Sequence, residues 1–143
     1  MDRGFFHLKV HGEDLDPAAV SALLNRNPTS SHRKGDIWSN GKGIYSFGSW
    51  SLDSGELSFR SGEKNCEDQL SDWVASLPGE AEVWTEIQKS HEAYVLLAFY
   101  MSTWNREFDI HPKTMLELGK RGLRIHIDTY YSEAKAAPET LPS

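Results

Sequence analysis

The sequence predicts an α+β fold, with a mainly antiparallel or mixed sheet and two to three helices packed on one face of that sheet. Residues 5–10 and 123–130 alternate apolar and polar side chains, as half-buried strands do. Segments between them repeat apolar residues at helical spacing and carry helix start and stop signals. The predicted order is strand, helix, two or three strands, a broken helix, strand, helix, strand. That order favours helices gathered on one side of a sheet.

The chain is predicted to fold as one unit. Its 143 residues suffice for a single core but not for two independent ones. We expect one α+β domain over residues 1–131. Residues 132–143, SEAKAAPETLPS, have the composition of a disordered C-terminal tail.

The first strand and helix are marked by simple signals. In residues 5–10 the apolar face holds Phe6, Leu8 and Val10, and the polar side of the strand carries His7, Lys9 and His11. Asp16 is a good N-cap for the helix that follows, and Pro17 takes the first helical position, where its missing N–H costs nothing. Residues 25–28 end this helix, because a residue before proline is pushed out of the helical region.

The sequence pattern of residues 44–60 predicts a strand and a hairpin. The strand covers residues 44–52, in which Ile44, Trp50 and Leu52 share one face. The turn at residues 53–55 then leads into a short return strand over residues 56–60.

A broken helix and a strand come next. Asn65 caps the first part, whose core-facing stripe consists of Leu70, Trp73, Val74 and Leu77. Pro78 and Gly79 break the helix, and residues 80–89 continue it. Residues 91–101 are almost continuously apolar, which predicts a central strand covered on both faces.

The last helix and strand complete the predicted domain. Pro112 opens the helix and Gly122 is its expected left-handed cap. The apolar residues of this helix are Met115, Leu116 and Leu118. In the final strand the outward residues are Arg124, His126, Asp128 and Tyr130.

Charge and composition exclude several function classes. The net charge of −6, from 21 acidic and 15 basic residues, argues against a duplex nucleic-acid binder. The longest apolar run, residues 93–101, is too short to span a membrane, and the first ten residues lack a signal-peptide layout. A single cysteine, Cys66, excludes an internal disulfide framework. We expect a cytoplasmic protein that is not bound to a membrane.

Five short strings, taken in order, resemble the bacterial family catalogued as domain of unknown function 4279. They are HGEDLDPAAVSALLNRNPT, HRKGD, the W-S-L of residues 50–52, HPKTMLELGKRGL and LRIHIDTYY. The resemblance covers residues 5–131, although the polar insert over residues 53–64 is longer than the family's usual spacing. It implies no established activity. In style the family is similar to small immunity-type or regulatory proteins of bacteria and phages.

The basic loop over residues 30–35 is the best candidate for contact with an anion. Hydroxyl, imidazole, guanidinium and ammonium groups converge beside a glycine there, on Ser31, His32, Arg33 and Lys34. The spacing is not that of a P-loop. The alternative is structural: Arg33 and Lys34 pair with Asp36 or with the acidic start of the first helix and hold the loop down.

The histidines do not indicate a metal centre. His7 and His11 lie about 13 Å apart on one strand and cannot share an ion, so at most one of them joins His126. That requires the first and last strands to be neighbours. No nucleophile elbow or catalytic pair is indicated, and Cys66 is interpreted as an ordinary cysteine. We expect no cofactor and no metal.

Exposed aromatic residues complete the candidate binding set. Trp38, Tyr45, Phe47 and Trp104 fall on loops or on the less protected strand face, where they either form a protein interface or close the open sheet face. The first hypothesis is a non-enzymatic protein that binds another protein, as an immunity-type or anti-defence factor. The alternative is a small-ligand or nucleotide-binding domain, with a weak or unknown enzymatic activity, whose site includes Arg33 and the His126 face.

Overall fold

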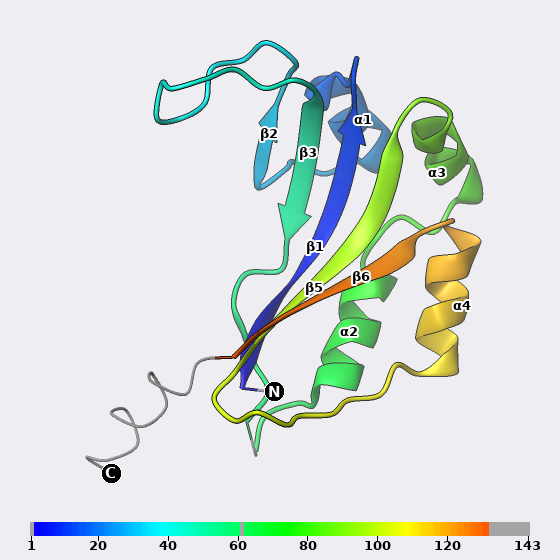
Figure 1. Cartoon of the computed structure of the whole chain (residues 1–143). Coiled ribbons are helices and arrows are strands. Elements are labelled where there is room, and N and C mark those ends of the chain that lie inside the picture. Colours follow the sequence, from blue (N-terminus) through cyan, green and yellow to red (C-terminus); the bar gives the residue numbers. More distant parts are fainter. Residues whose placement is uncertain (1, 61, 132–143) are drawn as a thin grey trace.

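The computed structural model describes residues 2–60 and 62–131 and confirms the α+β class (Figure 1). One mixed sheet has the strand order β2-β3-β1-β5-β6, and a short strand, β4, also pairs with β1. The strands are β1 (Arg3–Gly12), β2 (Ser30–His32), β3 (Gly48–Asp53), β4 (Leu57–Ser58), β5 (Glu92–Met101) and β6 (Arg124–Tyr131). Only β5 and β6 pair in parallel.

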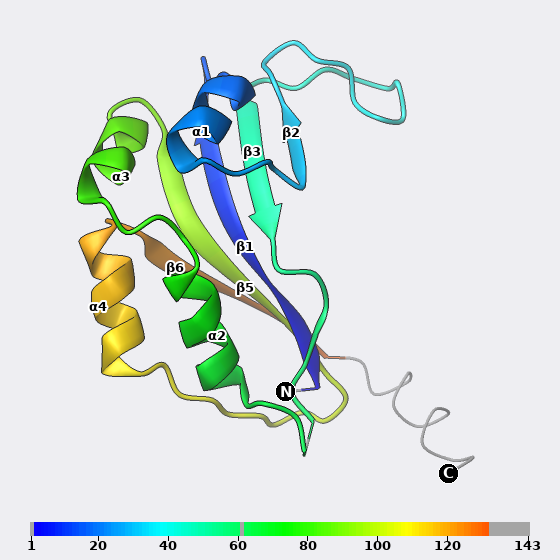
Figure 2. The ribbon, with the colours of Figure 1, turned by 180° about the vertical axis from the view of Figure 1, so that it is seen from behind.

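Four helices lie on one face of this sheet, as Figures 1 and 2 show from opposite sides. They are α1 (Pro17–Leu24), α2 (Cys66–Ala75), α3 (Ala81–Gln88) and α4 (Pro112–Lys120). The number exceeds the predicted two to three because the break at Pro78 and Gly79 separates α2 from α3 completely. The predicted C-terminal tail, residues 132–143, lies outside the described residues.

The core fills the space between the sheet and the helices. The predicted inward residues of β1, Phe6, Leu8 and Val10, are fully buried there, with Trp50 and Trp84 as the largest buried side chains. The indole N–H of Trp50 donates to the Ser21 hydroxyl of α1 at 2.9 Å, which ties β3 to the helix layer. Burial of such large aromatic side chains is the main stabilising contribution in a domain of this size.

The predicted helix ends are confirmed. Asp16 accepts a hydrogen bond from the backbone N–H of Ala18, and Asn65 accepts one from the backbone N–H of Asp68. Gly122 has φ of 69°, the left-handed conformation expected after the end of α4.

Two predictions about the middle of the chain were wrong. The strand begins at Gly48 rather than at residue 44, and Ile44 lies in the preceding loop, where it forms an isolated bridge with Ile37. The predicted hairpin is absent, because β4 pairs with β1 and not with β3. The Ser54 N–H donates to the Phe6 carbonyl and its hydroxyl accepts from the Phe6 N–H, so the chain continues along the same edge of β1.

Three further expectations need correction. The first and last strands are not neighbours, since β5 lies between β1 and β6. The strand over residues 92–101 is covered by helices on one face only, which leaves Tyr94 and Leu96 half-buried on the other. In α4 only Leu118 is buried among the predicted apolar residues, while Met115 and Leu116 are exposed.

Candidate functional site: the open sheet face

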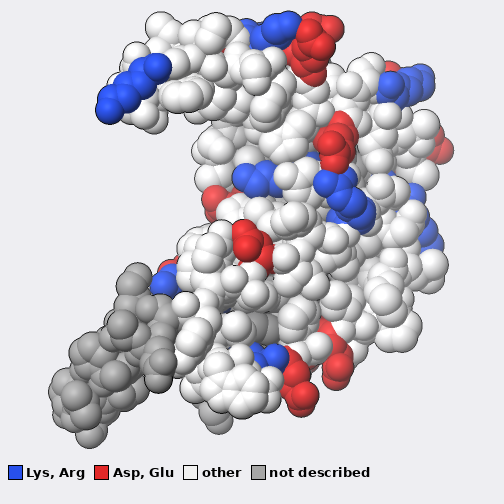
Figure 3. Space-filling model, viewed as in Figure 1, with Lys and Arg blue, Asp and Glu red and all other residues white. Residues whose placement is uncertain are grey.

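Within residues 2–60 and 62–131, no element covers the sheet face opposite the helices, and we call it the open face. Strand register places on it one outward row from each long strand and from the short strand β2. Its central members are His32, Ser49, Ser51, Asp53, His7, Lys9, His11, Tyr94, Leu96, Arg124, His126 and Asp128. Figure 3 shows this side of the molecule mostly white, with a few separate blue and red side chains.

The segment between β2 and β3, residues 33–47, is the second part of the site, and we call it the β2–β3 loop. Figure 1 shows it extending from the top of the sheet, and Figure 3 shows a hollow below it. Two backbone hydrogen bonds keep its two arms together: Gly35 N–H donates to the Tyr45 carbonyl, and Tyr45 N–H donates to the Asp36 carbonyl, both at 2.8 Å.

The basic part of this loop is tied to α1. Arg33 pairs with the N-cap Asp16 at 2.5 Å, and Lys34 pairs with Glu13 at 2.6 Å. The backbone N–H of Arg33 donates to the Asp36 carboxylate at 2.8 Å. The hydrogen bond that Lys34 donates to the Glu13 carboxylate raises the pKa of Lys34. Both cations are thus engaged within the chain, as the structural alternative expects, although exposed pairs of this kind contribute little stability.

Aromatic and imidazole rings join the β2–β3 loop to the open face. The ring of His32 stacks on that of Tyr45 with centroids 3.4 Å apart and planes at 9°. Phe47 presents its ring at a steep angle to His11 at 5.4 Å, and Trp38 meets Tyr45 edge-on at 6.5 Å. Trp38 and Phe47 each remain 43% exposed. The loop therefore brings an apolar, partly uncovered surface next to β1.

A second chain of rings crosses the open face from β1 to β6. The Nε2 atom of His11 and the hydroxyl of Tyr94 share a hydrogen bond of 3.2 Å. The ring of His126 lies 6.2 Å from that of Tyr94, and the Arg124 guanidinium lies 4.3 Å from the centroid of the same ring. Arg124 also pairs with Glu92. Tyr94 is the centre of this group and was missed in the sequence, where its strand was interpreted as covered on both faces.

Lys9 supplies a charge in the middle of the face. It lies between His7 and His11 on β1, opposite Ser51 of β3 and Tyr94 of β5. Within residues 2–60 and 62–131 it forms no ion pair. Burial, and after it the charge of Lys9, holds the pKa of both histidines below the ordinary value. Neutral imidazoles next to one ammonium group can donate and accept hydrogen bonds with a partner.

The predicted site residues are only partly brought together. In the β2–β3 loop Tyr45 contacts both Trp38 and the ring of His32, which is the last residue of β2, and Ser31 and His126 lie on the two edge strands of the sheet. Trp104 is 80% exposed beyond the far end of β5, near the start of β1, and contributes nothing to the open face. The described part of the chain contains no group of three potential metal ligands. Burial raises the pKa of Cys66 to about 12, so its thiol is unreactive at neutral pH.

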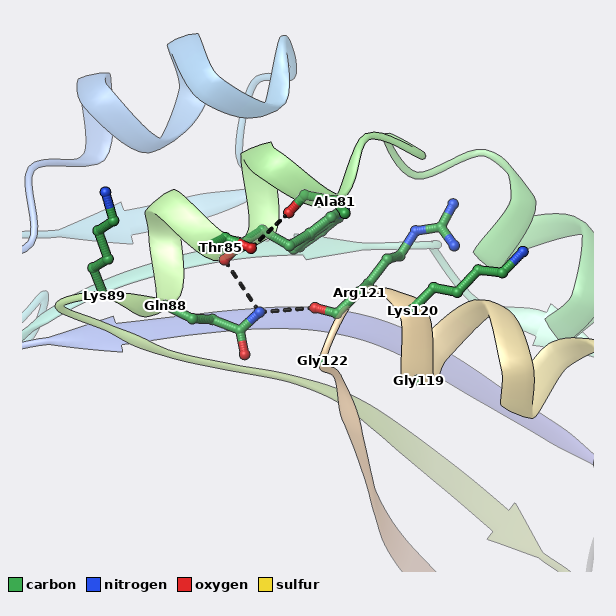
Figure 4. Close-up of a pocket in the computed structure, with 9 residues that line it drawn as sticks. Ala81, Thr85, Gln88, Lys89, Gly119, Lys120, Arg121 and Gly122 are labelled. Carbon is green, nitrogen blue, oxygen red and sulfur yellow. Dashed lines mark hydrogen bonds between the residues drawn. The ribbon is translucent and has the colours of Figure 1, made fainter.

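A groove on the helix side offers less chemistry. Figure 4 shows it between α3 and the end of α4, where Gln88 donates to the carbonyl of Arg121 at 2.8 Å. The Arg121 side chain is only 5% exposed, and its guanidinium donates to the carbonyls of Leu77, Pro78 and Glu117. Its donors are therefore occupied within the fold. This groove is a packing joint between helices, which sequence patterns did not reveal.

The helices of the described chain are too short and too polar for any of them to cross a bilayer.

Comparison with known proteins gives a family. The comparison with curated proteins and the comparison with solved structures each found no match. The family described as Domain of unknown function (DUF4279) matches residues 3–132, which is most of the chain. The motifs that carried the resemblance in the sequence lie within that range. The protein therefore belongs to the family domain of unknown function 4279.

Proposed function

We propose that this domain is a non-enzymatic protein that binds another protein through the open face and the β2–β3 loop. The observation that carries the proposal is the difference between the two sides of the sheet. Four helices cover one side, while the other presents rings from β1, β2, β5 and β6 that no layer covers in the part of the chain that the structure describes. Uncovered aromatic surface of this kind is typical of protein interaction sites.

The chemistry of these side chains suits a protein partner. Aromatic residues and arginine provide most of the binding energy at protein interfaces, because they bury large areas with few rotatable bonds. Trp38 and Phe47 offer partly exposed rings, and Arg124 offers a guanidinium already ordered on Tyr94. A partner that covers the hollow below the loop contacts Trp38 and Phe47, and one that extends across the sheet also reaches Arg124.

The net charge of the chain indicates the charge of the partner. A chain of net charge −6 is attracted at long range to a basic protein, such as an enzyme that handles nucleic acid. This supports an immunity-type or anti-defence role in a bacterium or phage. We propose a cytoplasmic location, because the single cysteine is kept as a buried thiol, as in a reducing compartment.

A second function is favoured by a specific observation, the group formed by His11, Tyr94 and His126 beside Lys9 and Arg124. Rings for stacking and two cations suit a planar anion such as a nucleotide. Since Arg33 is held by Asp16, this alternative places the anion on the open face rather than on the basic loop.

Capture from the native host separates the two functions. The tagged full chain is compared with a double variant, Trp38→Ala with Phe47→Ala, and with a control, Leu23→Ala, on the helix side of the molecule. We expect a stoichiometric protein that is retained by the wild type and the control and lost by the double variant. A protein captured equally by all three contradicts the assignment to this face. A bound small molecule without any protein partner supports the nucleotide alternative instead.

A further inference from the structure

We infer that β6 pairs with the β6 strand of a second copy of this chain, antiparallel and around a twofold axis at Ile127, so that two sheets become one. This surface is separate from the hollow below the β2–β3 loop. The inference does not depend on the proposed function, because it concerns contacts between two copies of the chain rather than contacts with another protein.

The two edges of the sheet differ. The β2 edge has three residues and is followed at once by the β2–β3 loop. The β6 edge has eight residues, RIHIDTYY, and β5 is its one neighbour in the described chain. Natural proteins protect exposed edges with short strands, proline, bulges or charged side chains, lysine above all. The β6 sequence contains no proline and no lysine, its charged residues are Arg124 and Asp128, and the rest is rich in Ile, Thr and Tyr, which favour strands. It is therefore suited to accept another strand.

Strand geometry limits how two copies of β6 can pair. Opposite residues of an antiparallel pair point to the same face of a sheet. A twofold axis perpendicular to that sheet therefore passes midway between one residue and its copy in the second chain, and we name the axis by that residue. An axis at Asp128 sets two carboxylates against each other. An axis at His126 pairs only residues 124–128 and sets two imidazoles against each other. An axis at Ile127 pairs residues 124–130 and opposes no like charges.

With the twofold axis at Ile127, the side chains that face one another across the two β6 strands are complementary. Ile127 is 47% exposed on the helix side of β6 and meets the same residue of the second copy, which removes apolar surface from water. On the open face His126 lies opposite Asp128 of the second copy, and the twofold axis generates this pair twice. Arg124 lies opposite Tyr130 of the second copy, which repeats the contact that Arg124 already makes with Tyr94.

The helix layer next to this edge is also uncovered. The helix α4 leads directly into β6, and Figure 2 shows it beside the start of that strand on the helix side. It exposes two large apolar side chains, Met115 and Leu116. Apolar side chains on both β6 and α4 suit association of this edge with a second copy of the same surface.

The association state of the full chain tests the inference. We expect sedimentation to show a monomer–dimer equilibrium between about 1 μM and about 1 mM. Ile127→Lys places two ammonium groups face to face at the axis and raises the dimer dissociation constant on the order of tenfold or more. The control is Ile44→Lys, the same substitution at a 63% exposed position in the β2–β3 loop, which leaves the dimer unchanged. A wild-type chain that stays monomeric, or an Ile127→Lys variant that dimerises normally, overturns the inference.

Cross-linking tests the register itself. Opposed residues of an antiparallel pair have Cα atoms about 4.5–5.5 Å apart, a separation that a disulfide can bridge. We expect Ile127→Cys to form a cross-linked dimer under mild oxidation, and Thr129→Cys, on the same face of β6, to form none. The native Cys66 is buried and does not compete. Equal cross-linking of both variants, or none with Ile127→Cys, refutes the Ile127 axis.

Discussion

Replacing Arg121 by methionine tests how the helix layer is held together. The side chain is 5% exposed and joins the end of α4 to the turn between α2 and α3. Its Nε donates to the Pro78 carbonyl at 2.9 Å, Nη1 to the Glu117 carbonyl at 2.8 Å, and Nη2 to the Leu77 carbonyl at 3.2 Å. Methionine keeps an unbranched apolar stem, is shorter than arginine, and removes every side-chain donor.

The expected loss follows from what each acceptor retains. The Pro78 carbonyl also accepts from the indole N–H of Trp84 at 2.8 Å, so it stays satisfied. The main-chain carbonyls of Leu77 and Glu117 lose the donor that Arg121 supplied. Leaving a buried acceptor without a partner costs about 1–3 kcal/mol. The hydrogen bond to Leu77 is buried and the one to Glu117 is partly buried, so we expect the free energy of unfolding to fall by about 2–3 kcal/mol.

Urea unfolding followed by tryptophan fluorescence measures this loss. The matched control is Lys120→Met, which removes a cation from the adjacent exposed position and is expected to change stability by less than about 0.5 kcal/mol. Arg121→Lys keeps the charge without the planar fork and falls between the two. If Arg121→Met loses no more than Lys120→Met, the guanidinium does not hold these helices together.

Three other outcomes are expected. Because the pKa of Cys66 is about 12 in the folded chain, the thiol of the unfolded chain ionises first as the pH rises. The free energy of unfolding therefore falls between about pH 9 and pH 12 by up to about 1.4 kcal/mol per pH unit. In urea unfolding we expect a smaller fall for Cys66→Ala, and an equal fall in that variant contradicts the role of Cys66. The folded pKa values of His7 and His11 are lowered, so the unfolded chain binds protons first as the pH drops below about 6.5 and stability is lost on acidification. The test is urea unfolding of the wild type and of the double variant, His7→Asn with His11→Asn, at about pH 7.5 and about pH 5.5. An equal loss of stability in the wild type and the variant contradicts the role of these histidines. Asp16→Ala removes both the cap of α1 and the Arg33 ion pair and costs about 1 kcal/mol in thermal or urea unfolding, whereas Asp14→Ala is near neutral; equal effects refute the capping role.

Features that depend on neighbouring residues could be predicted from the sequence. The Asp16 and Asn65 caps each bond to a backbone N–H two or three residues away, and Gly122 adopts its left-handed conformation at the end of its own helix. The alternation of β1 likewise identified its buried face. In each case the physical cause lies within one or two turns of the chain.

Features that depend on residues far apart in the chain could not be predicted from the sequence. Nothing near residues 57–58 indicates that they pair with Arg3 and Gly4, and nothing in β6 indicates that β5 is its neighbour. The candidate site shows the same difference between local features and features that depend on distant residues. His126 was expected on an outward face, but its neighbour Tyr94 was hidden in an apolar run. Arg33 was a candidate for anion contact until its pairing with Asp16, seventeen residues earlier, was visible.

The central position of β1 has a consequence for the synthesis of the chain. Arg3 is opposite Tyr100, so 97 residues (100 − 3) separate the two ends of that pairing. Of the strands in the described residues, β1 is synthesised first and lies in the middle of the sheet, and both of its long neighbours, β3 and β5, are made later. Such long loop closure makes folding slow. Until residue 101 has emerged, the edge of β1 that pairs with β5 stays free and its apolar face of Phe6, Leu8 and Val10 lacks part of its cover, which makes the nascent chain a substrate for chaperones.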